Sequence, residues 1–282
     1  MGYRFSKYEG LGNDFLVVEQ ANFPRLTGEL AKRLCDRHFG VGGDGVLVTG
    51  LREGRPFMHV VNADGSTPEM CGNGLRCVAL YLLDKGLVNE PSFEVSTDAG
   101  PHRVTVQRTP GESSSVEVQM RAASLDAGDV LRDASGQRVV EQSFDVDGRG
   151  LHVTAVSMGN PHIVLFDEVQ ADMAQLGPRI EKDARMLAGA NVGFAHLRDA
   201  HNLDLTVWER GVGFTLACGT GACAAAVAAI ESGRVDRSAP VTVHLPGGPL
   251  TVAVGELEGS ERAITMTGPA RHVFDGELDL TL

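Results

Sequence analysis

The chain has 282 residues, 43% of them hydrophobic, which is enough to build one large or two medium globular domains. Its formal net charge is −12, and no basic run is present, which argues against nucleic acid or an anionic membrane surface as the main partner. We therefore expect a small-molecule partner. No stretch has the apolar length of a signal peptide or a membrane-spanning helix, so we expect a cytoplasmic protein.

Strand and helix patterns alternate along the chain. Apolar alternation between turn residues indicates strands, and apolar residues spaced by three or four indicate helices. Strands are predicted at residues 14–20, 55–65, 162–168 and 202–211, and hairpins at 102–120 and 250–268. Helices are predicted at residues 27–40 and 173–187, and two more begin at Gly72 and Gly219. The sequence thus predicts a mixed α/β (α+β) fold, rich in strands around a few helices.

An internal duplication relates the two halves of the chain. The motif "CGNG" at Cys71 recurs as "CGTG" at Cys218, 147 positions later. Such a repeat predicts two copies of one structural unit, at about residues 1–120 and 150–270. The polar residues 122–150 between the copies, rich in Gly and Asp, suit a domain boundary. The same shift aligns further pairs: Asn13 with Asn160, Asp44 with Asn191, Asn62 with Glu209, and Gly86 with Gly233.

The five cysteines and nine histidines form no recognisable metal or disulfide pattern. An odd number of cysteines without a secretion signal argues against a disulfide framework. No Cys-x-x-Cys or His-Glu-x-x-His is present, so we expect no metal site. A Gly-x-Gly-x-x-Gly run at residues 40–45 follows a helical pattern and precedes a strand, which is the reverse of a dinucleotide site. We interpret it as a helix-to-strand turn.

Cys71 and Cys218 each stand at the start of a helical pattern. A helix N-terminus exposes backbone N–H groups and carries partial positive charge, which favours a bound carboxylate and lowers the pKa of a thiol placed there. The glycines after each cysteine let a ligand approach the backbone closely. A single cysteine in such a place is most often a small buried hydrophobic residue. The equivalence of these two under the duplication favours a functional pair instead.

Two equivalent units commonly pack about a pseudo-two-fold axis, which would place the two cysteines on opposite sides of a ligand between the units. A thiolate on one side would then remove a proton from a carbon, and a thiol on the other side would supply one. The pattern therefore predicts inversion of a carbon centre that carries a carboxylate.

Several segments resemble the diaminopimelate epimerase family of cofactor-independent amino-acid racemases and epimerases. They are "KYEGLGNDF", "NADGSTPEMCGNGLRC", "MGNPH", "NVGF" and "WERGVGFTLACGTGACA", and the resemblance covers essentially the whole chain. It implies two pseudo-symmetric units, each a strand barrel around a central helix, with the active site in the cleft between them. It also implies that residues 1–121 plus about 271–282 form the unit with Cys71, and that residues 122–270 form the unit with Cys218.

The resemblance implies conversion of LL-2,6-diaminopimelate to meso-diaminopimelate, in lysine and peptidoglycan precursor biosynthesis. It implies no pyridoxal phosphate or other cofactor, no metal, and a homodimer. Cys71 and Cys218 match the catalytic pair, and His162 and Glu209 match residues that support it. Glu209 with Arg210 also matches the pair that binds the distal end of the substrate. The other matched substrate-binding residues are Asn13, Asn62, Gly72, Asn73, Asn160, Asn191, Gly219 and Thr220.

Two features depart from the family pattern and flank the expected site. Phe214 stands where the family usually has Glu, and "MLAGANV" replaces a Phe-Pro segment before Asn191. Both bear on recognition of the distal end of the substrate. One alternative is a sibling racemase of hydroxyproline, proline or histidine type. The pair Glu209-Arg210 argues against it, because this pair favours a substrate with a polar distal end. An alternative of another class is a thiol–disulfide redox sensor, which would leave the Gly-x-Gly carboxylate seats unexplained.

Overall fold

The computed structural model describes residues 2–23, 25–108, 113–166, 169 and 172–279 of the chain. The chain forms two compact units. The first unit comprises Met1–Gln119 and Thr267–Leu282, and the second unit comprises Met120–Met266. Among the described residues, no helix combines the length and the apolar character needed to cross a membrane. Two predicted ends lie outside the described residues: 167–168 of one strand and 280–282 of the returning segment.

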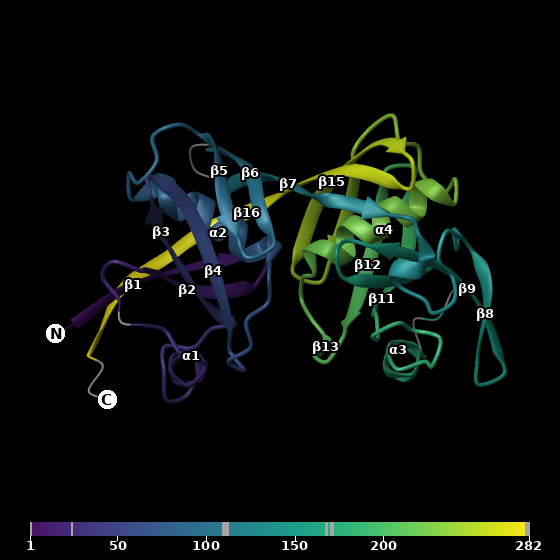
Figure 1. Cartoon of the computed structure of the whole chain (residues 1–282), viewed down its shortest axis with the longest axis horizontal. Helices are drawn as coiled ribbons and strands as arrows, with labels where there is room; N and C mark the ends of the chain where they lie inside the picture. Colours follow the sequence, from purple (N-terminus) through teal and green to yellow (C-terminus); the bar gives the residue numbers. More distant parts are fainter. Residues whose placement is uncertain (1, 24, 109–112, 167–168, 170–171, 280–282) are drawn as a thin grey trace. The chain divides into compact units, whose positions relative to one another are not determined.

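The first unit is a ring of strands around one helix (Figure 1). Strands β1 to β7 pair in chain order, and both β1 and β7 pair with the C-terminal strand β16. Helix α1 (Gly28–Cys35) connects the parallel strands β2 and β3. Helix α2 (Gly72–Asp84) contacts β1, β2, β3, β4 and β6, and its residues are buried from Gly72 to Leu82. The strands are β1 (Gly2–Gly10), β2 (Asn13–Glu19), β3 (Gly45–Arg52), β4 (Arg55–Asn62), β5 (Ser92–Thr97), β6 (Gly100–Gln107), β7 (Ser114–Ser124) and β16 (Glu261–Asp279).

The second unit repeats this arrangement around helix α4 (Gly219–Glu231). Helix α3 (Met173–Glu181) connects the parallel strands β10 and β11, as α1 does in the first unit. Helix α4 contacts β9, β10, β11, β12, β14 and β15, and nearly all of it is buried. A 3-10 turn, η1 (Ala127–Asp129), precedes the first strand of this unit. The strands are β8 (Gln142–Val146), β9 (Arg149–Ser157), β10 (Pro161–Leu165), β11 (Asn191–Asp199), β12 (Asn202–Glu209), β13 (Gly213–Phe214), β14 (Val241–Leu245) and β15 (Gly248–Glu258).

The bounds of equivalent elements coincide under the shift read from the sequence. Helix α2 moved by 147 positions is α4, and β4 moved by 147 positions is β12, residue for residue. The pairing sense also repeats: β2 and β3 are parallel like β10 and β11, and β4 and β5 are parallel like β12 and β14. The predicted mixed α/β fold of two pseudo-symmetric units, each a strand barrel around a helix, is confirmed.

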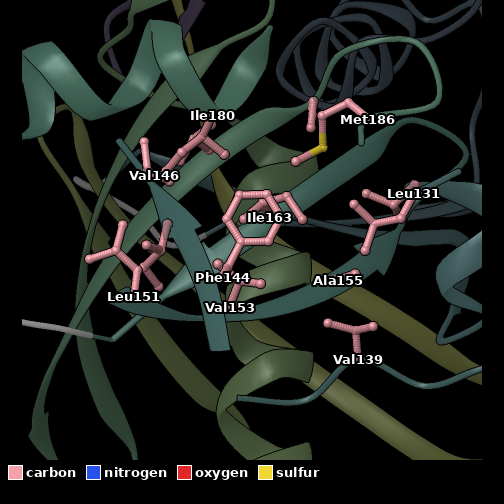
Figure 2. Close-up of a cluster of buried hydrophobic side chains, with 14 of the residues drawn as sticks. Leu131, Val139, Phe144, Val146, Leu151, Val153, Ala155, Ile163, Ile180 and Met186 are labelled. Atoms are coloured by element: carbon pink, nitrogen blue, oxygen red, sulfur yellow. The ribbon is translucent and has the colours of Figure 1, made fainter. Parts of the chain in front are cut away.

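The second unit has an apolar core cluster formed around Phe144, Ile163 and Ile180 (Figure 2). Residues 122–150 supply a large part of this cluster rather than forming a solvated link. That segment is therefore part of the second unit and not a link between the units, and the boundary lies just before it, between Gln119 and Met120. Its apolar side chains pack inward, and most of its charged ones stay outside. Those packed side chains are Ala127, Val130, Leu131, Ala134, Val139, Phe144 and Val146.

Both connecting helices end earlier than predicted. Helix α1 stops at Cys35 rather than at residue 40, because the Asp36 carboxylate accepts two backbone N–H groups of the next turn, at 2.7 and 2.8 Å. Helix α3 stops at Glu181 rather than at residue 187, and Asp183 accepts a backbone N–H two residues further on, at 2.9 Å. Such local side-chain bonds compete with the helix and end it.

The Gly-rich residues 40–45 connect α1 to β3. Gly42 has a φ of +83°, a conformation that glycine adopts at little cost. The helix precedes this run and the strand follows it, which confirms the interpretation as a turn.

Candidate active site

A cysteine caps the N-terminus of each central helix. Cys71 Sγ accepts the backbone N–H of Gly74 at 3.3 Å, and Cys218 Sγ accepts that of Gly221 at 3.4 Å. A side chain on either glycine would collide with the strand behind it, since a Cβ would lie 2.9 Å from Leu47 or from Val207. The two glycines therefore let the first helical turn pack closely below each sulfur. Each thiol lies beside the free N–H groups and the positive end of a helix.

In the first unit, a chain of hydrogen bonds crosses the start of α2. Arg76 Nη2 donates to Asn73 Oδ1 at 2.9 Å, and Asn73 Nδ2 donates to Asn13 Oδ1 at 3.0 Å. Asn13 Nδ2 in turn donates to Asp44 Oδ2 at 2.7 Å. The charged residues at the two ends set the direction of every bond, because a guanidinium only donates and a carboxylate only accepts. Both amides are therefore fixed against rotation by half a turn.

Charged groups stabilise both ends of this chain. Arg76 is fully buried and its Nε donates to the backbone oxygen of Pro269 at 3.1 Å. At the other end Arg37 Nη2 donates to Asp44 at 2.9 Å and to Asp14 at 2.6 Å. Hydrogen bonds from Arg37 and Lys7 lower the pKa of the Asp14 carboxyl against the opposing effect of burial. A buried charge needs such partners to remain ionised.

Asn62 takes a different position from Asn13 and Asn73. It ends β4, and its Nδ2 donates to Ser66 Oγ at 3.0 Å. Its backbone N–H donates to the backbone oxygen of Ser66. The backbone oxygen of Asn62 accepts the N–H of Gly65 at 2.9 Å, which closes a turn. Asn62 is thus half-buried at a turn, outside the hydrogen-bond chain that joins the other two asparagines.

In the second unit, a chain of hydrogen bonds ends on the cysteine itself. Asn160 Nδ2 donates to Thr220 Oγ1 at 3.3 Å, so the Asn160 oxygen faces His162 Nε2, 3.1 Å away, and accepts its proton. Thr220 Oγ1, which accepts from Asn160, lies 3.6 Å from Cys218 Sγ, where either group can donate and the hydroxyl donates once the sulfur is a thiolate. Burial, with a smaller effect of Arg210, lowers the pKa of His162 to about 3. The imidazole is therefore neutral, and the His162 and Asn160 donors run in the direction of the sulfur.

Glu209 acts on Cys218 in the opposite sense to these donors, because its negative charge disfavours a thiolate. Burial raises the pKa of the Glu209 carboxyl, and hydrogen bonds with Thr215 and Cys218 partly offset that rise. The Thr215 hydroxyl donates to Glu209 Oε1 at 2.5 Å. Burial and the negative Glu209 raise the pKa of Cys218 well above its ordinary value, while Thr220 and the N–H of Gly221 lower it. Cys218 therefore favours the neutral thiol and lies in contact with a carboxylate of raised basicity.

Arg210 and Asn191 are joined through the backbone. Asn191 begins β11, its Nδ2 donates to the oxygen of Pro161 at 3.1 Å, and its Oδ1 accepts the N–H of Arg210 at 3.0 Å. The guanidinium of Arg210 donates to the oxygen of Ala188 at 2.8 Å. Ala188 belongs to the segment that departs from the family pattern, so this departure supplies a contact to Arg210. The other departure, Phe214, packs edge-on against Trp208 with ring centroids 5.1 Å apart.

Some residues that support the site carry little signal in the sequence. Asp44 aligned with Asn191 under the shift, which was a usable signal, but Arg76 and Thr215 carried none beyond a single charge or hydroxyl near a cysteine motif. The other three cysteines, Cys35, Cys77 and Cys223, lie within helices and cap no helix N-terminus. Burial raises the pKa of Cys35 to about 11 and also raises that of Cys77. Among the described residues, no group of three or more His, Cys, Asp or Glu side chains is arranged to hold a metal ion.

A family model and curated relatives place the chain in a family. The family model for diaminopimelate epimerase matches residues 5–125 and 154–273. A diaminopimelate epimerase of Desulfitobacterium hafniense is 44% identical over 280 residues, covering 96% of each chain, and diaminopimelate epimerase 1 of Nostoc sp. is 42% identical over 99% of this chain and 100% of its own.

Solved structures share the fold at low sequence identity. A phenazine biosynthesis protein of the PhzF family from Bacillus anthracis has a TM-score of 0.72 at 16% identity, with 99% of this chain and 100% of that chain covered. A hydroxyproline epimerase from Agrobacterium vitis has a TM-score of 0.66 at 15% identity, covering 98% and 92%. These two likenesses concern the fold, whereas the family follows from the model match and the relatives above 40% identity. The chain belongs to the diaminopimelate epimerase family.

Proposed function

We propose that this protein epimerises LL-2,6-diaminopimelate to meso-diaminopimelate, with Cys71 and Cys218 as the acid and the base. The observation that carries the proposal is the pair of thiols that cap equivalent helices, in a chain whose relatives are named diaminopimelate epimerases. The substrate is a small amino acid. The product is a precursor for lysine and peptidoglycan.

In the proposed reaction the two thiols act in sequence on one α-carbon. A thiolate removes the α-proton, so a C–H bond breaks and an S–H bond forms, and the other thiol then gives its proton to the opposite face. The backbone N–H groups of Gly72-Asn73 and Gly219-Thr220 bind the carboxylate and stabilise the negative charge that develops beside the carbon. No oxidant, reductant or cofactor is needed. The roles of Cys71 and Cys218 are exchanged in the reverse direction.

The remaining polar residues orient the substrate. Arg210 suits the distal carboxylate and Glu209 suits an ammonium group, while Asn13, Asn160 and Asn191 supply donors and acceptors without net charge. Glu209 also contacts Cys218 and is the base best placed to take its proton, because burial raises the pKa of its carboxyl. The chain of donors that starts at His162 stabilises the thiolate once it forms.

The proposal extends to the organisation of the molecule. Residues 1–121 with about 271–282 form one functional half and 122–270 the other, and the substrate lies between them. We further propose a homodimer in the cytoplasm, on the model of the family.

Incubation with LL-diaminopimelate, followed by separation of the stereoisomers, tests the activity. We expect meso product from the purified chain with no added pyridoxal phosphate or metal, and none from L-proline, trans-4-hydroxy-L-proline or L-histidine. Inversion of one of those three in place of diaminopimelate would make the chain a sibling racemase. A chain that inverts none of them, but forms a reversible disulfide between Cys71 and Cys218 under mild oxidation, would fit a redox sensor.

A further inference from the structure

A buried carboxylate outside the predicted site contacts the turn that carries Glu209 and Arg210. Glu181, the last residue of α3, is 7% exposed. Its Oε2 accepts the indole N–H of Trp208 at 2.7 Å, and its Oε1 accepts the backbone N–H of Gly211 at 3.0 Å. The two contacts therefore lie on either side of the Glu209-Arg210 pair.

The turn itself leaves two donors that need partners. The N–H of Val212 donates to the oxygen of Glu209 at 3.1 Å, and Gly211 has a φ of +77°, as the third residue of a type II turn requires. The N–H groups of Arg210 and Gly211 point away from that bond. Asn191 accepts the first and Glu181 accepts the second. Without Glu181, the backbone N–H of the exposed Gly211 and the indole N–H of the half-buried Trp208 would both lose their acceptor.

Packing around Trp208 strengthens this contact. Helix α3 has Gly177 one turn before Glu181, and a Cβ on that glycine would lie 2.7 Å from the indole ring. The ring of Phe214 packs edge-on against the same indole. Trp208 is thus placed between α3 and β13, with its N–H directed at Glu181.

The first unit has apolar residues at the equivalent positions. The shift of 147 aligns Glu181 with Leu34 and Trp208 with Val61, and both of those residues lie in one apolar cluster of the first unit. The duplicated scaffold therefore does not need a carboxylate at this place to fold. The turn of the first unit carries Asn62, whereas that of the second carries the charged pair. Glu181 therefore occurs in the unit whose turn carries the charged pair Glu209-Arg210, and the other unit has Leu34 at the equivalent position.

We propose that Glu181 is a positioning residue that fixes the Glu209-Arg210 turn for substrate binding and proton transfer. This inference rests on the proposed function in so far as it concerns turnover. Its geometric part is independent of the reaction, because Trp208 is the only tryptophan of the chain and reports on the contact through its fluorescence.

Glu181→Gln in the full-length protein tests the inference. Glutamine has the same size but a single acceptor oxygen, so one of the two donors must face an amide N–H. We expect the Trp208 emission to shift to longer wavelength, the Gly211 amide to exchange faster with solvent, and kcat/KM to fall by about 10- to 100-fold. Lys182→Gln, an exposed charge-to-amide change at the next residue, is the matched control and should change none of these.

The two readouts separate the inference from the proposed function. Unchanged emission and Gly211 exchange in Glu181→Gln would overturn the inference whatever the enzyme's activity. Changed emission with unchanged kcat/KM, in an active wild-type enzyme, would overturn it as well. A wild-type protein without epimerase activity would sink the proposed function, and the fluorescence and exchange data would still decide the geometric part. If Glu181→Gln does not fold, Trp208→Phe removes the indole donor and keeps an aromatic ring, although a smaller one, at this place. A loss of kcat/KM in Trp208→Phe, smaller than that expected for Glu181→Gln, would support the inference. An unchanged kcat/KM in Trp208→Phe would overturn it.

Discussion

The two units share a cysteine-capped helix but surround it with different polar groups. In the first unit the hydrogen bonds run from the buried Arg76 to the carboxylate of Asp44, through Asn73 and Asn13. In the second unit they run from a neutral imidazole to the thiol of Cys218. The first chain fixes two amides, whereas the second supplies donors to the sulfur. The duplication thus preserved the backbone frame and let the electrostatics diverge.

This divergence has a chemical use. A two-base inversion needs one thiolate and one thiol at the same time, and two identical environments would favour the same protonation state at both sulfurs. Cys218 lies beside Glu209, whose charge favours the neutral thiol. Asn62 occupies the equivalent position before Cys71, and an amide carries no charge. Substitutions at the cysteines, His162, Arg76 and Phe214 test this difference between the units.

Removing either capping thiol should have the largest effect. Cys71→Ala or Cys218→Ala removes one of the two proton-transfer groups, and we expect epimerisation to fall by at least about 1,000-fold. Cys77→Ala, a buried thiol on the same helix as Cys71, should remain active and serves as the control. Stereoisomer analysis after incubation with LL-diaminopimelate gives the rates. Substantial turnover by either capping variant would show that its sulfur is dispensable.

His162 should make the stability of the second unit depend on pH. Its pKa is lowered from 6.5 to about 3, so between these values the unfolded chain binds a proton that the folded chain does not. The wild type should lose stability as the pH falls through this window, by at most about 1.4 kcal/mol per pH unit from this residue, and should gain nothing above it.

The measurement is the urea midpoint of wild type and His162→Gln at pH values above and within the window. We expect the advantage of the wild type to shrink as the pH falls toward 5. A stability difference that stays constant over this range would rule out a buried neutral imidazole.

Arg76 should matter for stability and for substrate binding. Arg76→Lys keeps a charge but cannot bond at once to Asn73 and to the oxygen of Pro269, so we expect a loss of about 1–3 kcal/mol in the free energy of unfolding. Freeing the amides of Asn73 and Asn13 should raise KM. Arg33→Lys, the same exchange at an exposed position of α1, is the matched control. Equal urea midpoints and equal KM for wild type and Arg76→Lys would show that the bonds of Arg76 support neither stability nor substrate binding.

Phe214 should have the smallest effect. Phe214→Glu restores the residue usual in the family and removes the edge-on contact with Trp208, which is worth about 0.5–1.5 kcal/mol. Phe214 is 45% exposed, so the lost contact should lower the melting temperature only slightly and leave kcat almost unchanged. A large fall in kcat would mean that the β13 side of the turn takes part in the reaction.

The sequence predicted features that repeat and missed those that depend on distant partners. The paired "CGxG" motifs and the single shift were enough to predict two units and two capped helices. Local patterns did not predict that Asp36 and Asp183 end their helices early, because apolar spacing does not register a side chain that bonds to the backbone. The buried segment 122–150 looked polar because its core residues are spread among charged ones.

The candidate site followed the same rule. Asn13, Asn73, Asn160 and Thr220 could be chosen from motifs, and the structure joins them into two hydrogen-bond chains. Arg76 and Glu181 could not be chosen, since their partners Pro269 and Gly211 are far away in the sequence and follow from the fold alone. The different charges at equivalent positions, such as the amide of Asn62 and the carboxylate of Glu209, show their effect on the cysteines only in the folded units.

Deuterium incorporation at the earliest stage of the reaction tests the two-base account most directly. LL-diaminopimelate is incubated with the enzyme in D2O, and both stereoisomers are isolated after a few per cent conversion and analysed by NMR. Because the donating thiol exchanges with solvent and the accepting thiolate takes the substrate's own proton, we predict deuterium at the inverted α-carbon of the meso product. The remaining LL substrate should carry none. A product that retains protium at that carbon would show that a single base returns the same proton, and it would contradict the paired roles of Cys71 and Cys218.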